Sequence, residues 1–209
     1  MRNLAENLGR LGEDVHLMTI VGNDADGSYL LDNSVGLFST HLTDRSESGQ
    51  TGSYHAILAT DGSLVAGYAD MEICEHMDRE WIESKRADFR RSKWVVADGN
   101  LDAGALEALV EYARTDAFQL CLIGVSAPKM KRMPRDLKGL DVMICNVDES
   151  QSYFETDEVK AERLCRLWLD AGVKKAVVTA GAGSVAYGED QVHLMETETL
   201  RAEDIEDVT

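Results

Sequence analysis

Residues 141–149, Asp-Val-Met-Ile-Cys-Asn-Val-Asp-Glu, contain a short uncharged run that passes directly into polar residues. Its apolar part, 142–145, is long enough for a buried strand and too short for a helix. In an open α/β sheet, ligands bind in the crevice at the carboxyl ends of the strands, so Asn146 and Glu149 would project into it. An amide and a carboxylate suit a hydrated Mg²⁺ and the phosphate oxygens that it bridges. The same residues also suit a plain helix start, with Asn146 as N-cap and Glu149 as its capping-box partner.

The chain after residue 92 repeats this strand–loop–helix pattern. Further apolar runs occupy 93–97, 119–124 and 175–179, and helical segments are expected at 103–114 and 159–171. The alternation predicts a mainly parallel sheet with right-handed crossovers, followed by a closing hairpin of 185–187 and 192–195. The carboxyl ends of parallel strands lie along one edge of a sheet, and all four ends here are polar or glycine-rich. We expect them to form a binding crevice lined by Asp98, Asn100, Ser126, Lys129, Asn146, Glu149, Thr179 and Gly181.

The first third of the chain begins with helical spacing. Leu4, Leu8 and Leu11 predict an amphipathic helix that starts at the first or second residue. A buried strand is expected at 15–21, then a turn at 23–27 and a short helix through Tyr29, Leu30 and Leu31. The glycine of that turn is not at the sixth position of a calcium loop, so we do not expect a calcium site there.

Between about residues 36 and 71 the pattern changes to strands alone. The runs 53–59 and 63–69 flank Thr60-Asp61-Gly62, and Asp-Gly is typical of a tight hairpin. This β-unit interrupts an alternating βα chain, so we expect it to stand off the main sheet. Three interpretations are open: a lid, a dimerisation sheet, or a small edge hairpin with no function.

Composition and charge limit the classes of partner. Hydrophobic residues make up 44% of the 209 residues, as in a folded globular protein, and 21 basic against 38 acidic residues give a net charge of −17. Such a surface repels anions, so neither nucleic acid nor a membrane is expected as a partner. The cysteines are too far apart in sequence for a zinc knuckle or a redox pair, which predicts a reducing, cytoplasmic location. They are Cys74, Cys121, Cys145 and Cys165.

The glycine-rich residues 179–183, Thr-Ala-Gly-Ala-Gly, contain the beginning of a dinucleotide fingerprint. That fingerprint requires a helix after the glycines, whereas 184–188 has the composition of a strand. A backbone loop lying against a nucleotide fits better. The chain has no G-x-x-x-x-G-K-[ST] sequence, so a P-loop is excluded.

Motifs distributed over the whole chain resemble the ribokinase-like (PfkB-type) carbohydrate kinases, and within that family the pseudouridine kinases. Residues 2–12 are similar to the helix after the family's diglycine substrate loop, and 21–27 to its V-G-D-D-x-x-G turn. Asn146 to Glu149 is similar to the family's N-x-x-E, which favours the ligand interpretation of these two residues without excluding the cap. The other matching stretches are Tyr54 and 69–71 in the lid, 96–100, 125–129, and 178–181 at the nucleotide-binding strand end.

The resemblance implies a three-layer α/β sandwich in which residues 1–209 form one partial domain with a β-lid at about 36–71. It implies transfer of the ATP γ-phosphoryl group to the 5′-hydroxyl of a small ribosyl substrate, pseudouridine first. ATP and Mg²⁺ are the implied cofactors; a monovalent cation and a homodimer through the lid are compatible with it. Asn146, Thr179, Gly181 and Gly183 would bind the nucleotide and Glu149 the metal. The implied substrate-binding residues are Asn3, Tyr54, Asp70, Asp98, Asn100, Ser126 and Lys129.

Two family motifs are expected just beyond these residues. A strand with a substrate-binding aspartate and a diglycine would precede Arg2-Asn3, and Gly-Ala-Gly-Asp, which supplies the general base, would follow Thr209 directly. The resemblance therefore implies an N- and C-terminally truncated kinase, with no catalytic base among these residues and no useful activity as written. The alternative interpretation is a non-catalytic scaffold that binds a ligand or dimerises.

Overall fold

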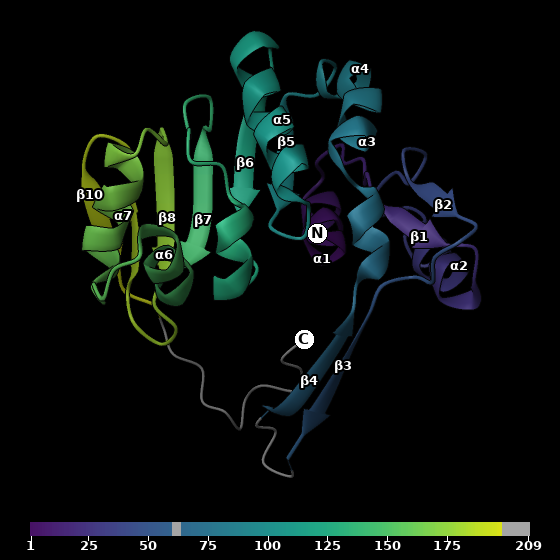
Figure 1. Ribbon diagram of the computed structural model, residues 1–209, viewed down its shortest axis with the longest axis horizontal. Helices are drawn as coiled ribbons and strands as arrows, with labels where there is room; N and C mark the ends of the chain where they lie inside the picture. The colour runs from purple at the N-terminus through teal and green to yellow at the C-terminus, as the bar shows by residue number, and fades with distance from the viewer. Residues whose placement is uncertain (60–63, 198–209) are drawn as a thin grey trace. The chain divides into compact units, whose positions relative to one another are not determined.

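The computed structural model describes residues 1–59 and 64–197 of the chain. These residues form two compact units, a first of Met1–Ile82 and a second that begins at Glu83. Figure 1 shows the helices and strands of both units. The expectation of one partial domain with an inserted lid stays a prediction.

The second unit is built on a six-stranded sheet with the order β10-β9-β8-β7-β6-β5. β5 to β8 are parallel neighbours that follow one another in sequence, and β9 and β10 are added as an antiparallel hairpin. The mainly parallel sheet and the closing hairpin are thus confirmed. The strands are β5 (Trp94–Asp98), β6 (Gln119–Ile123), β7 (Val142–Asn146), β8 (Lys175–Thr179), β9 (Val185–Gly188) and β10 (Val192–Met195).

Helices pack against this sheet through residues spaced by three or four positions. In α7 (Ala161–Asp170), Leu164, Cys165 and Trp168 are fully buried, and the helix contacts β8 and β9. Figure 1 shows α7 lying across the part of the sheet from β10 to β8 and α5 beside β5 and β6 at the other end. Both helices were expected from the sequence. The remaining helical segments of this unit are α4 (Arg86–Phe89), α5 (Ala103–Thr115), η2 (Ala127–Arg132), a 3-10 helix, and α6 (Val147–Phe154).

The first unit opens with α1 (Arg2–Arg10), as predicted, but the strand expected at 15–21 forms only in part. β1 covers Ile20–Gly22 and pairs in parallel with β2 (Asp44–Ser46), while His16 makes an isolated bridge to Ser39. Three residues lie between His16 and Ile20 but four between Ser39 and Asp44, because the partner segment turns there, and Thr43 N–H donates to the carbonyl of Thr40. That turn interrupts the ladder, so the run of apolar residues was a poor guide to strand length.

The segment 23–27, expected as a turn, is the start of α2 (Ala25–Asp32), with Asp24 as its N-cap. After β2, the chain forms a separate antiparallel sheet of β3 (Ser53–Leu58) and β4 (Leu64–Asp70), as predicted. The Thr60-Asp61-Gly62 turn itself lies outside the described residues. The unit ends in η1 (Glu72–His76), a 3-10 helix, and α3 (Arg79–Ser84). Residues 79–89 form two short helices, α3 and α4, which are separated at Lys85.

All four cysteines are free, and three are buried. Burial raises the pKa of Cys121 and Cys145 to about 12 and that of Cys165 to about 11, so these thiols stay protonated. These three buried cysteines act as small packing groups. Across 1–59 and 64–197, no helix combines the length and the hydropathy needed to cross a membrane.

Candidate functional site

The carboxyl ends of β5 to β8 lie next to one another along one edge of the second unit's sheet. Asp98 at the end of β5 is in register with Ile123, the last residue of β6. Ile123 is in register with Ile144 of β7, and Asn146 at the end of β7 is in register with Thr179 at the end of β8. The predicted alignment of strand ends is therefore present, with Asn146 and Thr179 on adjacent strands.

Asn146 and Glu149 form a complete capping box at the start of α6. The Asn146 side-chain oxygen accepts from the Glu149 backbone N–H at 2.8 Å, and the Glu149 carboxylate accepts from the Asn146 backbone N–H at 2.9 Å. Glu149 is only 4% exposed, and burial raises the pKa of its carboxyl group despite that hydrogen bond. The helix-start interpretation is thus confirmed, and it uses one oxygen of each side chain.

The capping box leaves two atoms for a ligand. Oε2 of Glu149 makes the capping bond, whereas Oε1 of Glu149 and Nδ2 of Asn146 bond to no residue in the described part of the chain. Among the same residues, Arg2 Nε is the one side-chain polar atom that is both buried and without a hydrogen-bond partner. Glu149 Oε1 has no partner either and is not in that buried class, so it keeps some contact with solvent. An accessible carboxylate oxygen is a ligand that Mg²⁺ prefers. No group of three or more His, Cys, Asp or Glu able to hold a metal occurs in residues 1–59 and 64–197, so Mg²⁺ would need phosphate oxygens and waters beside Glu149.

A buried chain of hydrogen bonds supports α6 from below. Ser150, which is fully buried, donates its hydroxyl to the Asn146 carbonyl at 2.9 Å and accepts from Trp168 Nε1 at 3.0 Å. The Trp168 ring also stacks on Tyr153 with 4.5 Å between ring centroids. Tyr153 in turn donates its hydroxyl to the Pro134 carbonyl at 2.7 Å. Because these groups are buried and bonded, α6 and its cap are fixed relative to α7 and the segment before β7.

The ends of β5 and β6 bring together three of the predicted substrate residues, Asp98, Asn100 and Lys129. Asp98 accepts from both the backbone and the side-chain N–H groups of Asn100 at 3.0 Å, and Lys129 Nζ donates to the Asn100 side-chain oxygen. An ammonium group has three donors, so Lys129 retains two for a ligand oxygen. Ser126 is the N-cap of η2 but makes no capping hydrogen bond through its side chain. The cluster therefore offers donors to a polyhydroxylated or anionic ligand.

The glycine-rich loop after β8 ends in a strand. Gly181 has φ 59°, a left-handed conformation that glycine adopts without strain, and Gly183 N–H donates to the Ala180 carbonyl at 2.9 Å. The next element is β9, so the helix that a dinucleotide fingerprint needs is not there. Thr179 thus ends β8 beside Asn146, and Gly181 and Gly183 lie on the tight exposed loop that follows it.

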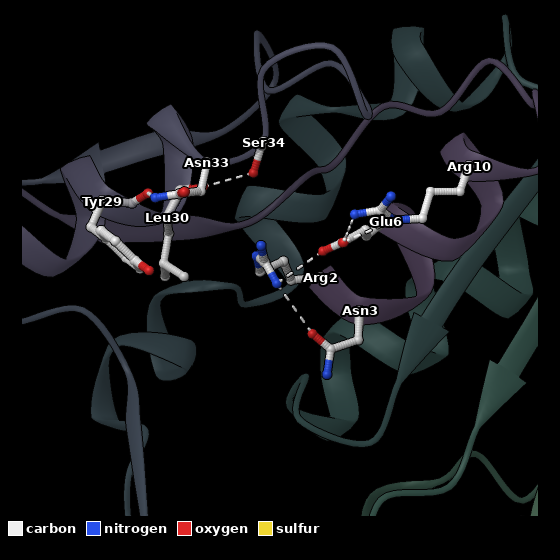
Figure 2. Close-up of polar contacts among 8 residues, drawn as sticks. All are labelled: Arg2, Asn3, Glu6, Arg10, Tyr29, Leu30, Asn33 and Ser34. Atoms are coloured by element: carbon white, nitrogen blue, oxygen red, sulfur yellow. Dashed lines mark hydrogen bonds and ion pairs between the residues drawn. The ribbon is translucent and has the colours of Figure 1, made fainter. Parts of the chain in front are cut away.

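The other predicted substrate residues, Asn3, Tyr54 and Asp70, belong to the first unit. Figure 2 shows Asn3 on α1, with its side-chain oxygen accepting from Arg2 at 3.4 Å and its nitrogen pointing away from Arg2. Arg2 also pairs with Glu6 at 3.2 Å, so Asn3 flanks a small charged cluster. Tyr54 and Asp70 lie on β3 and β4, where Asp70 pairs with Ser53, the residue before Tyr54. Their common site with the residues of the second unit stays a prediction.

A cluster of hydrogen bonds around Asp24 in the first unit was not predicted. Asp24, the N-cap of α2, accepts from Gly27 N–H at 2.7 Å and from both the backbone N–H and the hydroxyl of Thr51 at 2.7 Å each. The Thr51 hydroxyl also accepts from Gly22 N–H at 2.9 Å. The hydrogen bonds from Thr51 hold the pKa of Asp24 at about 2. Thr51 is 27 residues from Asp24 in sequence, so no local motif reveals this contact.

The pfkB family carbohydrate kinase model matches residues 1–209 of this chain. The chain belongs to the pfkB family of carbohydrate kinases. This PfkB chain is 34% identical over 108 residues to an uncharacterized sugar kinase of Escherichia coli, an alignment that covers 51% of the chain and 30% of the relative. It is 31% identical over 115 residues to a pseudouridine kinase of Escherichia coli, covering 54% of the chain and 36% of the relative.

Solved structures place the PfkB chain in the ribokinase-like α/β fold. A carbohydrate kinase from Agrobacterium tumefaciens matches with a TM-score of 0.78 at 25% identity over 90% of this chain and 60% of that one. A ribokinase II of Escherichia coli, solved with ATP and Mg²⁺, matches with a TM-score of 0.78 at 13% identity, which concerns the fold alone. The alignments span about a third of the length of the curated relatives.

Proposed function

We propose that this PfkB protein transfers the γ-phosphoryl group of ATP to the 5′-hydroxyl of a ribosyl substrate, most specifically pseudouridine. The observation that carries the proposal is the capping box at the end of β7, which fixes Asn146 and Glu149 yet leaves Glu149 Oε1 and Asn146 Nδ2 for a ligand. Both atoms lie at the carboxyl edge of a mainly parallel sheet, where open α/β folds bind ligands.

Each group has a separate task in phosphoryl transfer. Bound Mg²⁺, which Glu149 would hold together with waters and phosphate oxygens, neutralises charge on the phosphates. Asn146 Nδ2 would donate to a phosphate oxygen, and Thr179 with the loop of Gly181 and Gly183 would bind the nucleotide beside it. Such transfers depend mainly on positioning and charge neutralisation. The hydrogen bond from Ser150 to the Asn146 carbonyl would contribute to the positioning by holding the start of α6 in place.

The substrate preference rests on the strand end of β5 and on one relative. Lys129 and Asn100 provide hydrogen-bond donors that are already oriented by Asp98, as recognition of sugar hydroxyls or base carbonyls requires. The pseudouridine kinase of Escherichia coli is 31% identical over the aligned region. We assign the ribosyl hydroxyls to Asn3 and the lid residues Tyr54 and Asp70.

No residue of this sequence is assigned as the general base of the proposed reaction. The 209 residues contain no Gly-Ala-Gly-Asp sequence, the motif whose aspartate accepts the proton of the attacking hydroxyl in the resemblance described above. Substrate and nucleotide binding need no base, so they can be tested whether or not the assayed polypeptide turns over.

We also propose a homodimer through the β3–β4 hairpin. Two strands alone are marginally stable in water, and this pair exposes large side chains along its length. Ile57 is 62% exposed, Val65 65% and Tyr68 67%. A second copy of the hairpin would cover these side chains, and sedimentation of the wild type against Tyr68→Lys would detect the dimer.

The test compares ligands in the protein as its gene encodes it. Binding to the native state raises Tm by an amount that grows with the logarithm of the ligand concentration over Kd, so thermal shifts at equal concentrations of pseudouridine, ribose, adenosine or fructose 6-phosphate, each with ATP and Mg²⁺, rank the substrates. Pseudouridine should give the largest rise, and kcat/KM should follow the same order where turnover occurs. A larger rise in Tm with any of the other three would overturn the substrate assignment. An unchanged Tm with ATP and Mg²⁺ would overturn the proposed kinase function.

A further inference from the structure

Gly124 follows β6 directly and lies against the side chain of Glu149. Its N–H donates to the Ile144 carbonyl at 2.8 Å, which holds it beside β7. A Cβ at this residue would lie 2.2 Å from Glu149 Oε2 and 2.7 Å from Glu149 Cδ. Gly124 is not among the glycines with positive φ, so alanine could adopt its backbone conformation. Glycine is therefore required here because there is no space for a side chain, and not because of the backbone conformation.

The Glu149 carboxylate has little freedom to move away from a side chain at residue 124. Oε2 is the oxygen that accepts from the Asn146 backbone N–H at 2.9 Å, and the whole residue is 4% exposed. A Cβ at residue 124 would also lie 3.3 Å from Cys145 Cβ, on the strand that carries the cap. Any displacement of Oε2 thus breaks the capping box or distorts the end of β7.

We propose that Gly124 is a positioning residue for Glu149. Its missing side chain leaves the space in which Oε2 caps α6, and this arrangement makes Oε1 the oxygen that is available to a cation. The cation part of this inference rests on the proposed function, whereas the coupling between residues 124 and 149 does not. A substitution at 124 should therefore act through Glu149.

A double-mutant cycle on Tm tests the coupling in the protein as its gene encodes it. Gly124→Ala should lower Tm by about 2–8 °C in the wild-type background, as overpacking does. In a Glu149→Ala background the same substitution should lower Tm by less than about 1 °C, because the clashing atoms are gone. Glu149→Asp, whose carboxylate is one methylene shorter, should restore part of the loss in Gly124→Ala.

Gly99 provides a matched control at the end of β5. A Cβ there would meet nothing closer than the terminal methyl of Met133 at 3.3 Å, a flexible group that can move. Gly99→Ala should change Tm equally in the wild-type and Glu149→Ala backgrounds. If Gly124→Ala does not fold alone but folds together with Glu149→Ala, the coupling is supported; equal Tm losses in both backgrounds would overturn it.

A second readout separates positioning from mere support of the fold. The half-saturating Mg²⁺ concentration is measured from the rise in Tm at fixed ATP, and Gly124→Ala should raise it by about 10-fold, a typical effect of a residue that orients a metal ligand. Gly99→Ala should leave it unchanged. If Glu149→Gln raises this concentration and Gly124→Ala does not, the positioning role is wrong. If Glu149→Gln does not raise it, the proposed metal role of Glu149 fails, and the Tm cycle still decides whether Gly124 positions the carboxylate.

Discussion

The β1–α2 and β7–α6 junctions have the same local design but shift the pKa of their carboxyl groups in opposite directions. Each joins a strand to an eight-residue helix through a polar N-cap, Asp24 in one and Asn146 in the other. Both oxygens of Asp24 accept hydrogen bonds, and its pKa falls to about 2. Glu149 has one bonded oxygen, and burial raises its pKa.

This difference separates the Asp24 carboxylate, which has three donors, from the Glu149 carboxylate, which has one and for which a cation is proposed above. Protein donors already compensate the charge of Asp24, so a metal there would have to displace them. The charge of Glu149 is desolvated and only partly compensated, a state that a cation would relieve. A cap motif in the sequence does not tell the two apart; the number of donors around the carboxylate does.

The largest effect should follow from removing the hydroxyl that completes the first junction. Thr51→Val leaves the buried Gly22 N–H without an acceptor and removes one of the three donors to Asp24, which should cost about 2–4 kcal/mol in the free energy of unfolding. Thr51→Ser keeps the hydroxyl and should cost about 1 kcal/mol or less. Urea unfolding followed by circular dichroism measures both. Equal small losses in the two variants would show that the hydrogen-bond cluster around Asp24 contributes little to the free energy of unfolding.

The next effect is a dependence on pH that belongs to Asp24. A folded pKa of about 2, below the usual value, means that ionised Asp24 stabilises the fold fully above about pH 4 and loses this effect as the pH falls toward 2. Asp24→Asn should therefore be destabilised relative to the wild type at pH 6, with the difference shrinking toward pH 2. Tm measured from pH 2 to 7 for both proteins provides the test, and a constant difference would contradict it.

The smallest effect, with the opposite slope, is expected for Glu149→Gln. Because its folded pKa is raised, Glu149 favours the folded state most at low pH and loses that advantage as the pH rises through the raised value. Glutamine can still serve in the capping box, so the variant should lie within about 1 kcal/mol of the wild type and gain on it from pH 4 to 7. If Asp24→Asn and Glu149→Gln showed slopes of the same sign, the contrast between the junctions would be wrong.

The sequence was sufficient for the strand order of the second unit because the alternation of apolar runs with helical segments makes consecutive strands parallel neighbours. The uncharged run at 142–145 and three similar runs predicted β5 to β8, and their alternation with helices predicted the parallel order. The capping box was readable at Asn146 and Glu149 from their three-residue spacing, whereas the ligand role predicted for the same pair stays a prediction. The Asp98–Asn100–Lys129 cluster followed from the rule that strand ends share an edge.

Features that depend on distant residues or on exact distances were not predictable. The strand expected at 15–21 is interrupted because its partner turns after Ser39, and the role of Asp24 depends on Thr51. Gly124 resembles any glycine at a strand end until the position of Glu149 Oε2 is known. Composition and periodicity describe which residues are buried, whereas these features depend on which atoms meet.

The hydrogen-bond chain under α6 gives the protein a built-in optical reporter. Trp168 is fully buried, and one serine hydroxyl connects its indole N–H to the carbonyl of Asn146. A ligand that shifts Asn146 should change the polarity around the indole and hence the wavelength and intensity of its emission. With Trp81 and Trp94 replaced by phenylalanine, Trp168 would be the sole tryptophan of these 209 residues, and nucleotide arrival at the end of β7 could be followed in real time without an attached dye.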